Sequence, residues 1–240
     1  MKDVYNDILA AKKSNEKLLT ILMDPDKTSI DSIPSLINKV NQTKITHIFV
    51  GGSTVEEGII DGFISEIKKN TELPVLIFPG DITQISDKAD ALLFLSLISG
   101  RNPKYLIGKQ VEAVAKLKGA FLEVIPTGYL LIENGKETAV QRVSETKPMS
   151  RNDIQLITDT AKAGELLGME LIYLEAGSGA KHPINEEIIS KVKSSLNIPL
   201  IVGGGIRTIN QLNLAYQSGA DMVVIGTAFE EDEAFFNELK

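Results

Sequence analysis

The chain alternates between short apolar runs of strand length and longer segments with helical periodicity. Most of the apolar runs are continuous, as in Val75-Leu76-Ile77-Phe78 and Met222-Val223-Val224-Ile225. Continuous apolar strands are typical of a parallel sheet that helices cover on both faces. Strands are therefore predicted at Leu18–Met23, His47–Val50, Val75–Phe78, Ala91–Leu97, Ala120–Ile125, Leu171–Leu174, Leu200–Val202 and Met222–Ile225.

Three of the intervening segments carry clear helix signals. Ile33–Val40 has a proline in its first turn, and Ile154–Leu167 repeats apolar residues at helical spacing. Ile209–Gln217 follows Thr208, a suitable N-cap, and precedes Gly219, a suitable C′ residue. Eight strands with interleaved helices predict a (β/α)8 TIM barrel, an α/β fold, with a doubly wound parallel sheet as the alternative. No linker interrupts the pattern, so residues 1–240 are predicted to form one domain.

Two places break this alternation. Only twelve residues, Pro79–Asp90, separate the third and fourth predicted strands, and they leave little room for a helix. We therefore expect a loop in place of the third barrel helix. The second break is the long connection Pro126–Ser150, in which Tyr129–Lys136 contains an Asn-Gly pair after β-prone residues. That pattern predicts a β-hairpin, and long ordered loops are often functional.

The composition excludes several classes of protein. The apolar fraction of 43% and the charged fraction of 24% are those of an ordinary soluble domain. The absence of cysteine excludes disulfides, thiolate zinc sites and cysteine nucleophiles, and two histidines leave almost no basis for a multi-histidine metal site. With 25 basic and 32 acidic residues, the net charge of 25 − 32 = −7 argues against a nucleic-acid partner.

No segment resembles a signal peptide or a membrane span. The first seven residues lack an apolar core, and the longest nearly apolar run, Ala89–Ile98, is too short to cross a bilayer. We therefore expect a cytoplasmic protein without an integral membrane segment.

Candidate chemistry lies where the strands end, because the active sites of such barrels are built from the loops that follow the strands. Gly203-Gly204-Gly205 and Gly226-Thr227 follow the seventh and eighth strands, the common phosphate site of this fold. Gly177-Ser178-Gly179, after the sixth strand, would add a third wall of backbone donors. The alternative is that these glycines only relieve crowding in tight or flexible turns.

Four acidic residues are predicted near the strand ends: Asp24, Asp81, Glu123 and Glu175. Glu175 could orient or deprotonate a substrate hydroxyl if it points into the barrel mouth. It could equally form a structural ion pair with a lysine, and the sequence does not distinguish the two roles.

Asp24 ends the first strand and is a candidate Mg²⁺ ligand, with the hydroxyl of Ser53 at the neighbouring strand end. The alternative role, an Asx turn that caps the following helix, is assigned to Asp26. His47 begins a strand, away from the catalytic end, so we interpret it as structural. His182 is interpreted as part of a solvent-exposed turn.

Five segments together resemble the geranylgeranylglyceryl phosphate synthase family, the prenyltransferases that form the first ether bond of archaeal-type lipids and that include bacterial members. The resemblance covers nearly the whole chain, and the run Tyr-Leu-Glu-Ala-Gly-Ser-Gly is its most specific motif. The segments are Leu22–Lys27, Val50–Ser53, Tyr173–Gly179, Gly203–Arg207 and Gly226-Thr227.

The resemblance implies a barrel in which a loop replaces helix three, and it implies roles for individual residues. Asp24 and Ser53 correspond to the magnesium ligands. Leu22 stands where one branch of the family has a lysine, so the chain resembles the other branch. The residues that correspond to the sn-glycerol 1-phosphate site are Tyr173, Leu174, Glu175, Ala176, Gly177, Ser178, Gly179, Gly204, Gly205, Gly226 and Thr227.

The expected activity is Mg²⁺-dependent transfer of a geranylgeranyl group from its diphosphate to the 3-hydroxyl of sn-glycerol 1-phosphate, with Glu175 as the orienting group and base. Tyr129 and the long fifth loop are expected to help cover the site, and the loss of helix three to open an apolar groove for the prenyl chain. The resemblance also implies a homo-oligomer, either dimer or hexamer, with at most a peripheral membrane contact for product release. The alternatives are a phosphosugar isomerase or synthase and a non-catalytic protein that binds a phosphate ligand.

Overall fold

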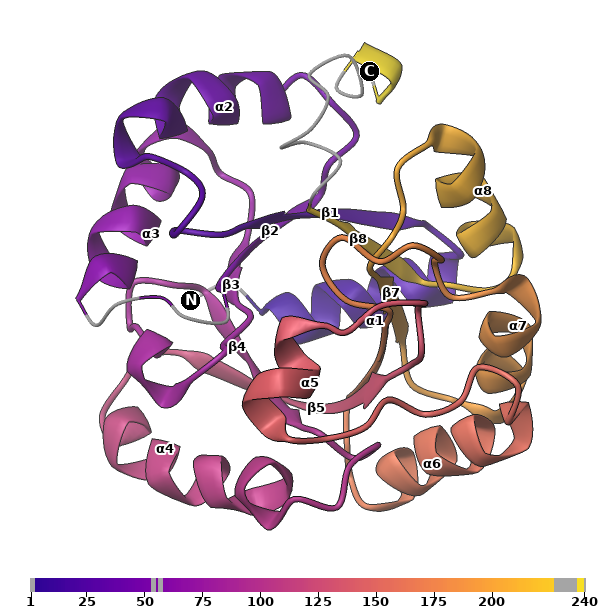
Figure 1. Ribbon diagram of the computed structural model, residues 1–240. Coiled ribbons are helices and arrows are strands. Elements are labelled where there is room, and N and C mark those ends of the chain that lie inside the picture. The colour runs from indigo at the N-terminus through magenta and orange to yellow at the C-terminus, as the bar shows by residue number, and fades with distance from the viewer. Residues whose placement is uncertain (1–2, 53–54, 56–57, 227–236, 240) are drawn as a thin grey trace.

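Eight parallel strands close into a barrel in the order β1 to β8 (Figure 1). The computed structural model describes residues 3–52, 55, 58–226 and 237–239. The closed barrel confirms the predicted fold class and excludes the doubly wound sheet. The strands are β1 (Leu18–Met23), β2 (His47–Val50), β3 (Val75–Ile77), β4 (Ala91–Ser96), β5 (Glu123–Leu131), β6 (Leu171–Glu175), β7 (Leu200–Gly203) and β8 (Met222–Ile225).

Helices surround the barrel, and the capping residues and proline in the sequence predicted the bounds of two of them. The predictions for α2 and α8 hold to the residue, and the Thr208 side chain accepts a hydrogen bond from the Gln211 amide at 3.2 Å, as an N-cap does. None of the described helices is long and apolar enough to cross a bilayer. The helices are α1 (Val4–Ser14), α2 (Ile33–Val40), α3 (Ile59–Asn70), α4 (Lys109–Leu117), α5 (Ala139–Ser144), α6 (Ile154–Leu166), α7 (Glu186–Ser195) and α8 (Ile209–Gln217).

Short helical turns occupy three of the connections, and one of them confirms the missing barrel helix. Between β3 and β4 the described chain forms only the 3₁₀ turn η2 (Ile82–Gln84). Asp81 caps this turn by accepting from the Thr83 amide at 3.3 Å. The other two turns are η1 (Ile30–Ser32), before α2, and the π-helical turn η3 (Lys104–Gly108), before α4.

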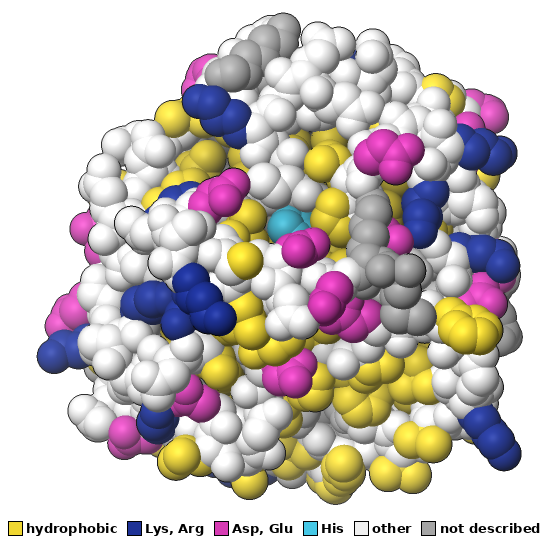
Figure 2. Space-filling view, turned by 180° about the vertical axis from the view of Figure 1, so that it is seen from behind, with side chains coloured by type: hydrophobic (Ala, Val, Ile, Leu, Met, Phe, Trp, Pro, Cys, Tyr) yellow, Lys and Arg dark blue, Asp and Glu magenta, His cyan; other side chains and the backbone are white. Residues whose placement is uncertain are grey.

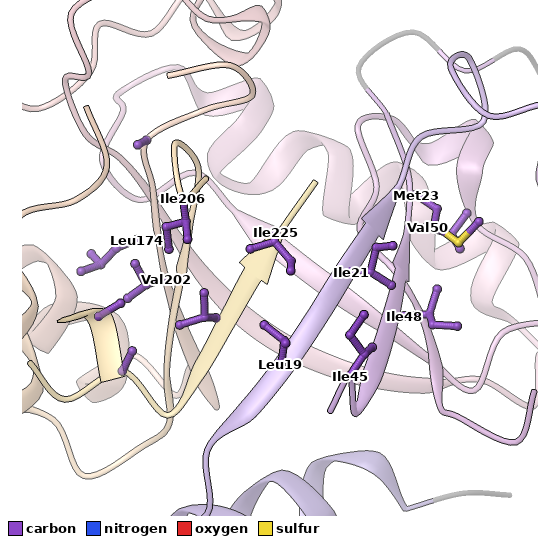
Figure 3. Close-up of a cluster of buried hydrophobic side chains, with 14 of the residues drawn as sticks. Leu19, Ile21, Met23, Ile45, Ile48, Val50, Leu174, Val202, Ile206 and Ile225 are labelled. Carbon is purple, nitrogen blue, oxygen red and sulfur yellow. The ribbon is translucent and has the colours of Figure 1, made fainter. Parts of the chain in front are cut away.

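The strands bury both of their faces, which explains why their sequences are continuously apolar. Figure 3 shows Leu19, Ile21 and Met23 of β1 beside Ile48 and Val50 of β2, in the layer between the strands and the helices. The alternate positions, among them Leu18, Phe49 and Tyr173, fill the barrel interior.

Helix α1, which we did not predict, closes the amino-terminal end of the barrel. Its Val4 and Ile8 side chains belong to the same buried cluster as the interior residues. The Glu123 carboxylate accepts hydrogen bonds from the Val4 amide at 2.7 Å and the Tyr5 amide at 2.9 Å. These two amides of the first turn have no partner within the helix, so Glu123 supplies it. Glu123 therefore lies at the opposite end from the site, and its prediction as a strand-end acid was wrong because β5 begins there.

Strand β5 is longer and later in the sequence than predicted, and the expected hairpin does not form. The strand extends through Pro126–Tyr129, which we had placed in a loop, to Leu131. It pairs along β4 from Glu123 and along β6 as far as Leu131, so both neighbours satisfy its backbone. Ile132 then forms a parallel bridge with Met149, and this long-range pairing overrides the local Asn-Gly signal.

Candidate active site

One pocket lies at the carboxyl ends of the strands and encloses about 230 Å³. Its polar end is formed by the loops after β6, β7 and β8, and it continues past the ends of β1 and β2. Its apolar arm runs toward η2, β4 and α4, where the barrel helix is missing, and α5 forms part of its cover. The prediction that the site lies in the loops that follow the strands is therefore confirmed for the pocket.

The glycine loops after β6 and β7 pack directly against each other. Gly204 and Gly205 adopt positive φ angles of 86° and 74°, and Gly177 has a φ of 99°. A Cβ atom on Gly204 would lie 2.5 Å from both the Gly177 nitrogen and Glu175 Oε1. Only glycine allows this contact. Because glycine has no side chain, the backbone of these loops is exposed to the polar end of the pocket. Gly179 and Gly226 also line this end, and Thr227 lies outside the described residues.

Gly203 has a different role from the glycines that follow it. It is the last residue of β7 and faces the barrel interior, where a Cβ atom would lie 2.2 Å from the Tyr173 hydroxyl. The missing side chain makes room for that tyrosine. For this one glycine, relief of crowding is the correct interpretation.

The residues of β6 and its loop divide between the pocket and the core. Tyr173, Glu175, Gly177, Ser178 and Gly179 line the pocket. Leu174 and Ala176 belong instead to the buried layer between the strands and the helices. Their side chains therefore face away from a bound ligand, and a contact with glycerol phosphate would have to come from their backbone.

Glu175 points into the barrel mouth and is only 5% exposed. Its carboxylate accepts hydrogen bonds from the hydroxyls of Tyr129 and Tyr173 and, at 2.5 Å, from the Gly177 amide. No ion pair to it occurs among the residues that the structure describes. This arrangement favours a polar role in the site over the structural lysine pair.

Burial raises the pKa of Glu175 to about 6, although its three hydrogen bonds act in the opposite direction. Burial also raises the pKa of Tyr129 and Tyr173 well above 10, and the neighbouring Glu175 adds to the effect. The two hydroxyls therefore stay protonated and act as donors. Glu175 is ionised at neutral pH, and its pKa lies close enough to neutral pH for it to accept a proton from a substrate.

An aromatic cluster forms the floor beneath Glu175. Phe78 stacks on Tyr173 with ring centroids 5.2 Å apart, and Tyr129 meets Tyr173 edge to face at 5.4 Å. Tyr129 comes from β5 itself, so it supports the site from below instead of covering it from the loop, as we had expected. The segment that does line the pocket from the long connection is α5 with its N-cap, Thr138.

Asp24 lies at the end of β1 and lines the pocket beside Gly52. Its Oδ1 accepts from the Asp26 amide at 3.1 Å, and Lys27 Nζ lies 3.8 Å from Oδ2. Asp24 therefore forms an Asx turn, the role that we had assigned to Asp26. A Cβ atom on Gly52 would lie 2.3 Å from Asp24 Oδ1, so a glycine is required beside this carboxylate. Ser53, the other predicted magnesium ligand, lies outside the described residues.

Gln84, in η2, is a supporting residue that sequence reasoning missed. It is 1% exposed, and its side-chain amide donates to the Gly52 carbonyl at 2.7 Å. Its Oε1 accepts from the Gly80 amide at 3.1 Å. Gln84 therefore ties the loop after β2 to the loop after β3 and holds Gly52 next to Asp24. No motif marks this residue, because its role depends on the loop that replaces the helix.

Two further groups in the pocket wall also escaped prediction. Lys109 of α4 forms an ion pair with Asp81 at 2.6 Å, and the hydrogen bond that it donates to the Asp81 carboxylate raises the pKa of Lys109. Arg207 lines the polar end beside the glycine loops and donates to the Ala180 carbonyl at 2.8 Å. Arg207 lies two residues after the last glycine of the motif, so its position was the available signal.

The histidines lie where we expected them. His47 is buried at the start of β2, and its Nδ1 lies 2.8 Å from the Thr46 hydroxyl. His182 is exposed in the loop after β6. Neither residue lines the pocket.

The closed barrel and its pocket define the class: a TIM-barrel protein with a pocket at the carboxyl ends of its strands, in which a glycine-lined polar end joins an apolar arm. Comparison with known proteins identifies the family within this class. The chain belongs to the PcrB family, which matches residues 11–240.

Relatives in this family extend over nearly the full chain. Geranylgeranylglyceryl phosphate synthase of Flavobacterium johnsoniae is 57% identical over 98% of this chain and 96% of its own length. The protein of the same name from Thermococcus kodakarensis is 42% identical over 92% of this chain and 87% of its own length. The crystal structure of (S)-3-O-geranylgeranylglyceryl phosphate synthase from Thermoplasma acidophilum, in complex with the substrate sn-glycerol-1-phosphate, is 35% identical, with a TM-score of 0.93, and covers 100% of this chain and 96% of that one. These matches confirm the family that the motifs had indicated.

Proposed function

We propose that the chain transfers a geranylgeranyl group from geranylgeranyl diphosphate to the 3-hydroxyl of sn-glycerol 1-phosphate, releasing diphosphate. The observation that carries this proposal is the shape of the pocket, in which a glycine-lined polar end joins an apolar arm. The polar end suits a small phosphate ester, and the apolar arm suits a long hydrocarbon chain. The names of the relatives, and the substrate bound in the Thermoplasma structure, support the same reaction.

The polar end is proposed to bind glycerol phosphate through the backbone of Gly204, Gly205 and Gly177–Gly179, with Arg207 as a nearby positive charge. Backbone amides at close-packed glycines can reach phosphate oxygens that a side chain would keep away. The hydroxyls of the ligand would then point toward Glu175, at the centre of the barrel mouth.

Glu175 is proposed to accept the proton of the 3-hydroxyl as that oxygen forms its bond to C1 of the prenyl chain. The bond between C1 and the diphosphate oxygen breaks, and its electron pair leaves with the diphosphate. The hydroxyls of Tyr129 and Tyr173 hold the carboxylate in place, so its position is fixed before the substrate arrives. The aromatic floor closes the pocket beneath Glu175, so packed rings and not water face the reacting carbon from the barrel side.

A single Mg²⁺ ion is proposed to bind at Asp24, whose carboxylate lines the pocket. Within the described part of the chain, no group of three or more acidic or histidine side chains could hold a metal. An ion at Asp24 would therefore take its other ligands from water and substrate phosphates, as Mg²⁺ often does. When bound, Mg²⁺ would neutralise the charge that develops on the departing diphosphate. Asp24 and, by the family resemblance, Ser53 would hold it.

The prenyl chain is proposed to lie in the apolar arm, along the outer side of β4. Ile82, Ile85, Leu92, Phe94 and Ala113 line this arm. A barrel helix after β3 would occupy this space, so the short η2 turn is what leaves it open.

We also infer a cytoplasmic homo-oligomer, either dimer or hexamer, that has no nucleic-acid partner and meets the membrane only peripherally to release its product. These inferences follow from the family resemblance and the acidic composition.

The test is an assay with sn-glycerol 1-phosphate, radiolabelled geranylgeranyl diphosphate and Mg²⁺. A lipid-soluble labelled product is expected with this enantiomer, and much less with sn-glycerol 3-phosphate or with EDTA. Turnover of phosphosugars without prenyl transfer would favour the isomerase alternative. Binding of glycerol phosphate without any product would favour the non-catalytic one.

A further inference from the structure

Lys109 is a charged residue in the wall of the apolar arm. Tyr105, Lys109 and Ala113 all line the pocket, and their spacing of four residues is that of one helix face. The two outer residues suit a hydrocarbon chain, whereas the lysine between them does not. The Lys109 side chain is only 20% exposed, so most of its surface is withdrawn from water. A charge in such a place costs folding free energy unless an anion faces it.

The anion that faces Lys109 in the structure is Asp81, at the start of η2. Lys109 Nζ donates to Asp81 Oδ2 at 2.6 Å, and the more exposed carboxylate of Glu112 lies 3.8 Å away. Asp81 is held in place by its role as the cap of η2, where its other oxygen accepts from the Thr83 amide. The lysine is the longer and more flexible partner. A stronger anion in the pocket could therefore take over the ammonium by rotation of the Lys109 side chain alone.

A series of contacts places this ion pair beside the proposed position of the donor diphosphate. Gly52 lies against the Asp24 carboxylate, and Gln84 ties Gly52 to the residue that precedes Asp81. The pair is therefore two strand ends away from Asp24, at the end of β3. A donor with its diphosphate at Asp24 and its chain in the apolar arm has to pass this point. Lys109 lines the pocket there.

The charges of the pocket favour Lys109 as the cation that meets the donor. Among the described residues that line the pocket, the cations are Lys27, Lys109 and Arg207. Lys27 lies beside the Asp24 carboxylate, and Arg207 lies at the glycine loops. A single Mg²⁺ at Asp24 would leave part of the diphosphate charge unbalanced. Figure 2 shows the other face of the molecule, where basic and acidic side chains lie interspersed, so that face presents no concentrated positive charge to an anion.

We propose that Lys109 leaves Asp81 when the prenyl donor binds and places its ammonium on the diphosphate, where it orients the leaving group and balances the negative charge that the group gains. This role rests on the proposed function and adds a side chain to its donor site. The lysine stays protonated throughout and forms no covalent bond. It exchanges a hydrogen bond to a carboxylate for one to a phosphate oxygen, while the bond between C1 and the diphosphate oxygen breaks as described above.

Binding of inorganic diphosphate in the presence of Mg²⁺, measured by titration calorimetry on the full chain, tests the role without a prenyl chain. Lys109→Met keeps a long side chain but removes the ammonium. It should weaken diphosphate binding by about 10-fold or more, the scale of one charge-assisted hydrogen bond. Lys109→Arg should retain most of the affinity. Lys118→Met, at the C-cap of the same helix, is the matched control and should bind as the wild type does.

Asp81→Asn separates donor binding from a purely structural role of the ion pair. Asparagine can still cap η2, but it has no charge to hold the lysine, so this variant should bind diphosphate at least as tightly as the wild type. If the pair only braced η2 against α4, Asp81→Asn and Lys109→Met would weaken binding alike and lower Tm alike. In the prenyl transfer assay, Lys109→Met should raise KM for the prenyl diphosphate and leave KM for sn-glycerol 1-phosphate unchanged.

Three results would overturn the proposal: a wild type that binds no diphosphate with Mg²⁺, a folded Lys109→Met variant with wild-type affinity, and an Asp81→Asn variant that loses affinity to the same extent. Circular dichroism checks folding, and Lys109→Gln repeats the measurement if the methionine variant does not fold. Loss of diphosphate binding in Lys109→Met, together with a wild type that transfers no prenyl group, would contradict the proposed function alone. Prenyl transfer with unchanged diphosphate binding would contradict the role of Lys109 alone.

Discussion

Glu175→Gln tests the central residue of the site in two independent ways. The folded chain holds the pKa of Glu175 at about 6, against 4.5 for an unperturbed glutamate. A raised pKa means that folding favours the protonated form. The stabilisation is therefore complete below pH 4.5 and is lost as the pH rises through 6. Glutamine does not titrate in this range, so the variant lacks this pH dependence.

The size of the effect follows from the pKa difference. The pKa of Glu175 rises from 4.5 to about 6, a difference of about 1.5. At about 1.4 kcal/mol per unit, this corresponds to roughly 2 kcal/mol of unfolding free energy. Between pH 4 and pH 8, the wild type should therefore lose about 2 kcal/mol relative to Glu175→Gln. For a chain of this size, the relative Tm should change by about 4 to 8 °C.

Activity gives the second measurement. If Glu175 accepts the proton of the substrate hydroxyl, kcat per folded molecule should fall by about 10²-fold or more at pH 8, where the variant is relatively stable. Glu187→Gln, at an exposed glutamate on α7 outside the pocket, controls for the same chemical change and should keep full kcat. A variant whose stability follows the wild type at both pH values would show that the carboxylate is not desolvated. Full kcat would remove Glu175 from the reaction.

Asp24→Asn should keep the Asx turn, since the amide oxygen still accepts a hydrogen bond, but it should abolish most Mg²⁺-dependent turnover. Titration calorimetry with Mg²⁺ and substrate diphosphate measures the lost binding, and an unchanged Mg²⁺ dependence would leave Asp24 as a turn residue alone. Gly204→Ala should raise KM for glycerol phosphate and also lower Tm. The backbone φ of 86° disfavours any side chain, and the new Cβ atom would lie 2.5 Å from Glu175 Oε1. An unchanged KM would limit the role of this glycine to turn geometry. Tyr129→Phe removes a donor to the Glu175 carboxylate and should move the acid limb of the kcat/KM profile upward by about one pH unit. Tyr216→Phe, which alters a distant half-buried tyrosine, should lower stability without moving that limb, and the same profile in both variants would refute the contact.

Local signals made three of the helices and most strands predictable. Thr208 and Gly219 mark the two ends of α8 by their own backbone preferences, so its boundaries needed no tertiary information. Strand β8 is a continuous apolar run and was predicted to the residue. The glycine loops were located for the same reason, because each directly follows such a run.

The misplaced features depend on contacts between distant parts of the chain. The length of β5 follows from its pairing with β4 and β6, which no local pattern around Pro126 encodes. Glu123 meets Val4 across a separation of 119 residues, and only this contact makes it a helix cap. Glu175 could be named as a candidate from its place after β6. Its hydrogen bond from Tyr129 exists only because the barrel sets β5 beside β6.

The contact between the tyrosine pair and Glu175 gives the protein a built-in optical reporter. The chain has five tyrosines and no tryptophan, so tyrosine dominates its ultraviolet emission. Tyr129 and Tyr173 donate to a buried carboxylate, and such an acceptor quenches tyrosine fluorescence through proton transfer in the excited state. The other three hydroxyls donate to backbone carbonyls and contribute a steady background. Emission should therefore brighten when Glu175 is protonated or turns toward a ligand hydroxyl, so glycerol phosphate binding can be followed without any label.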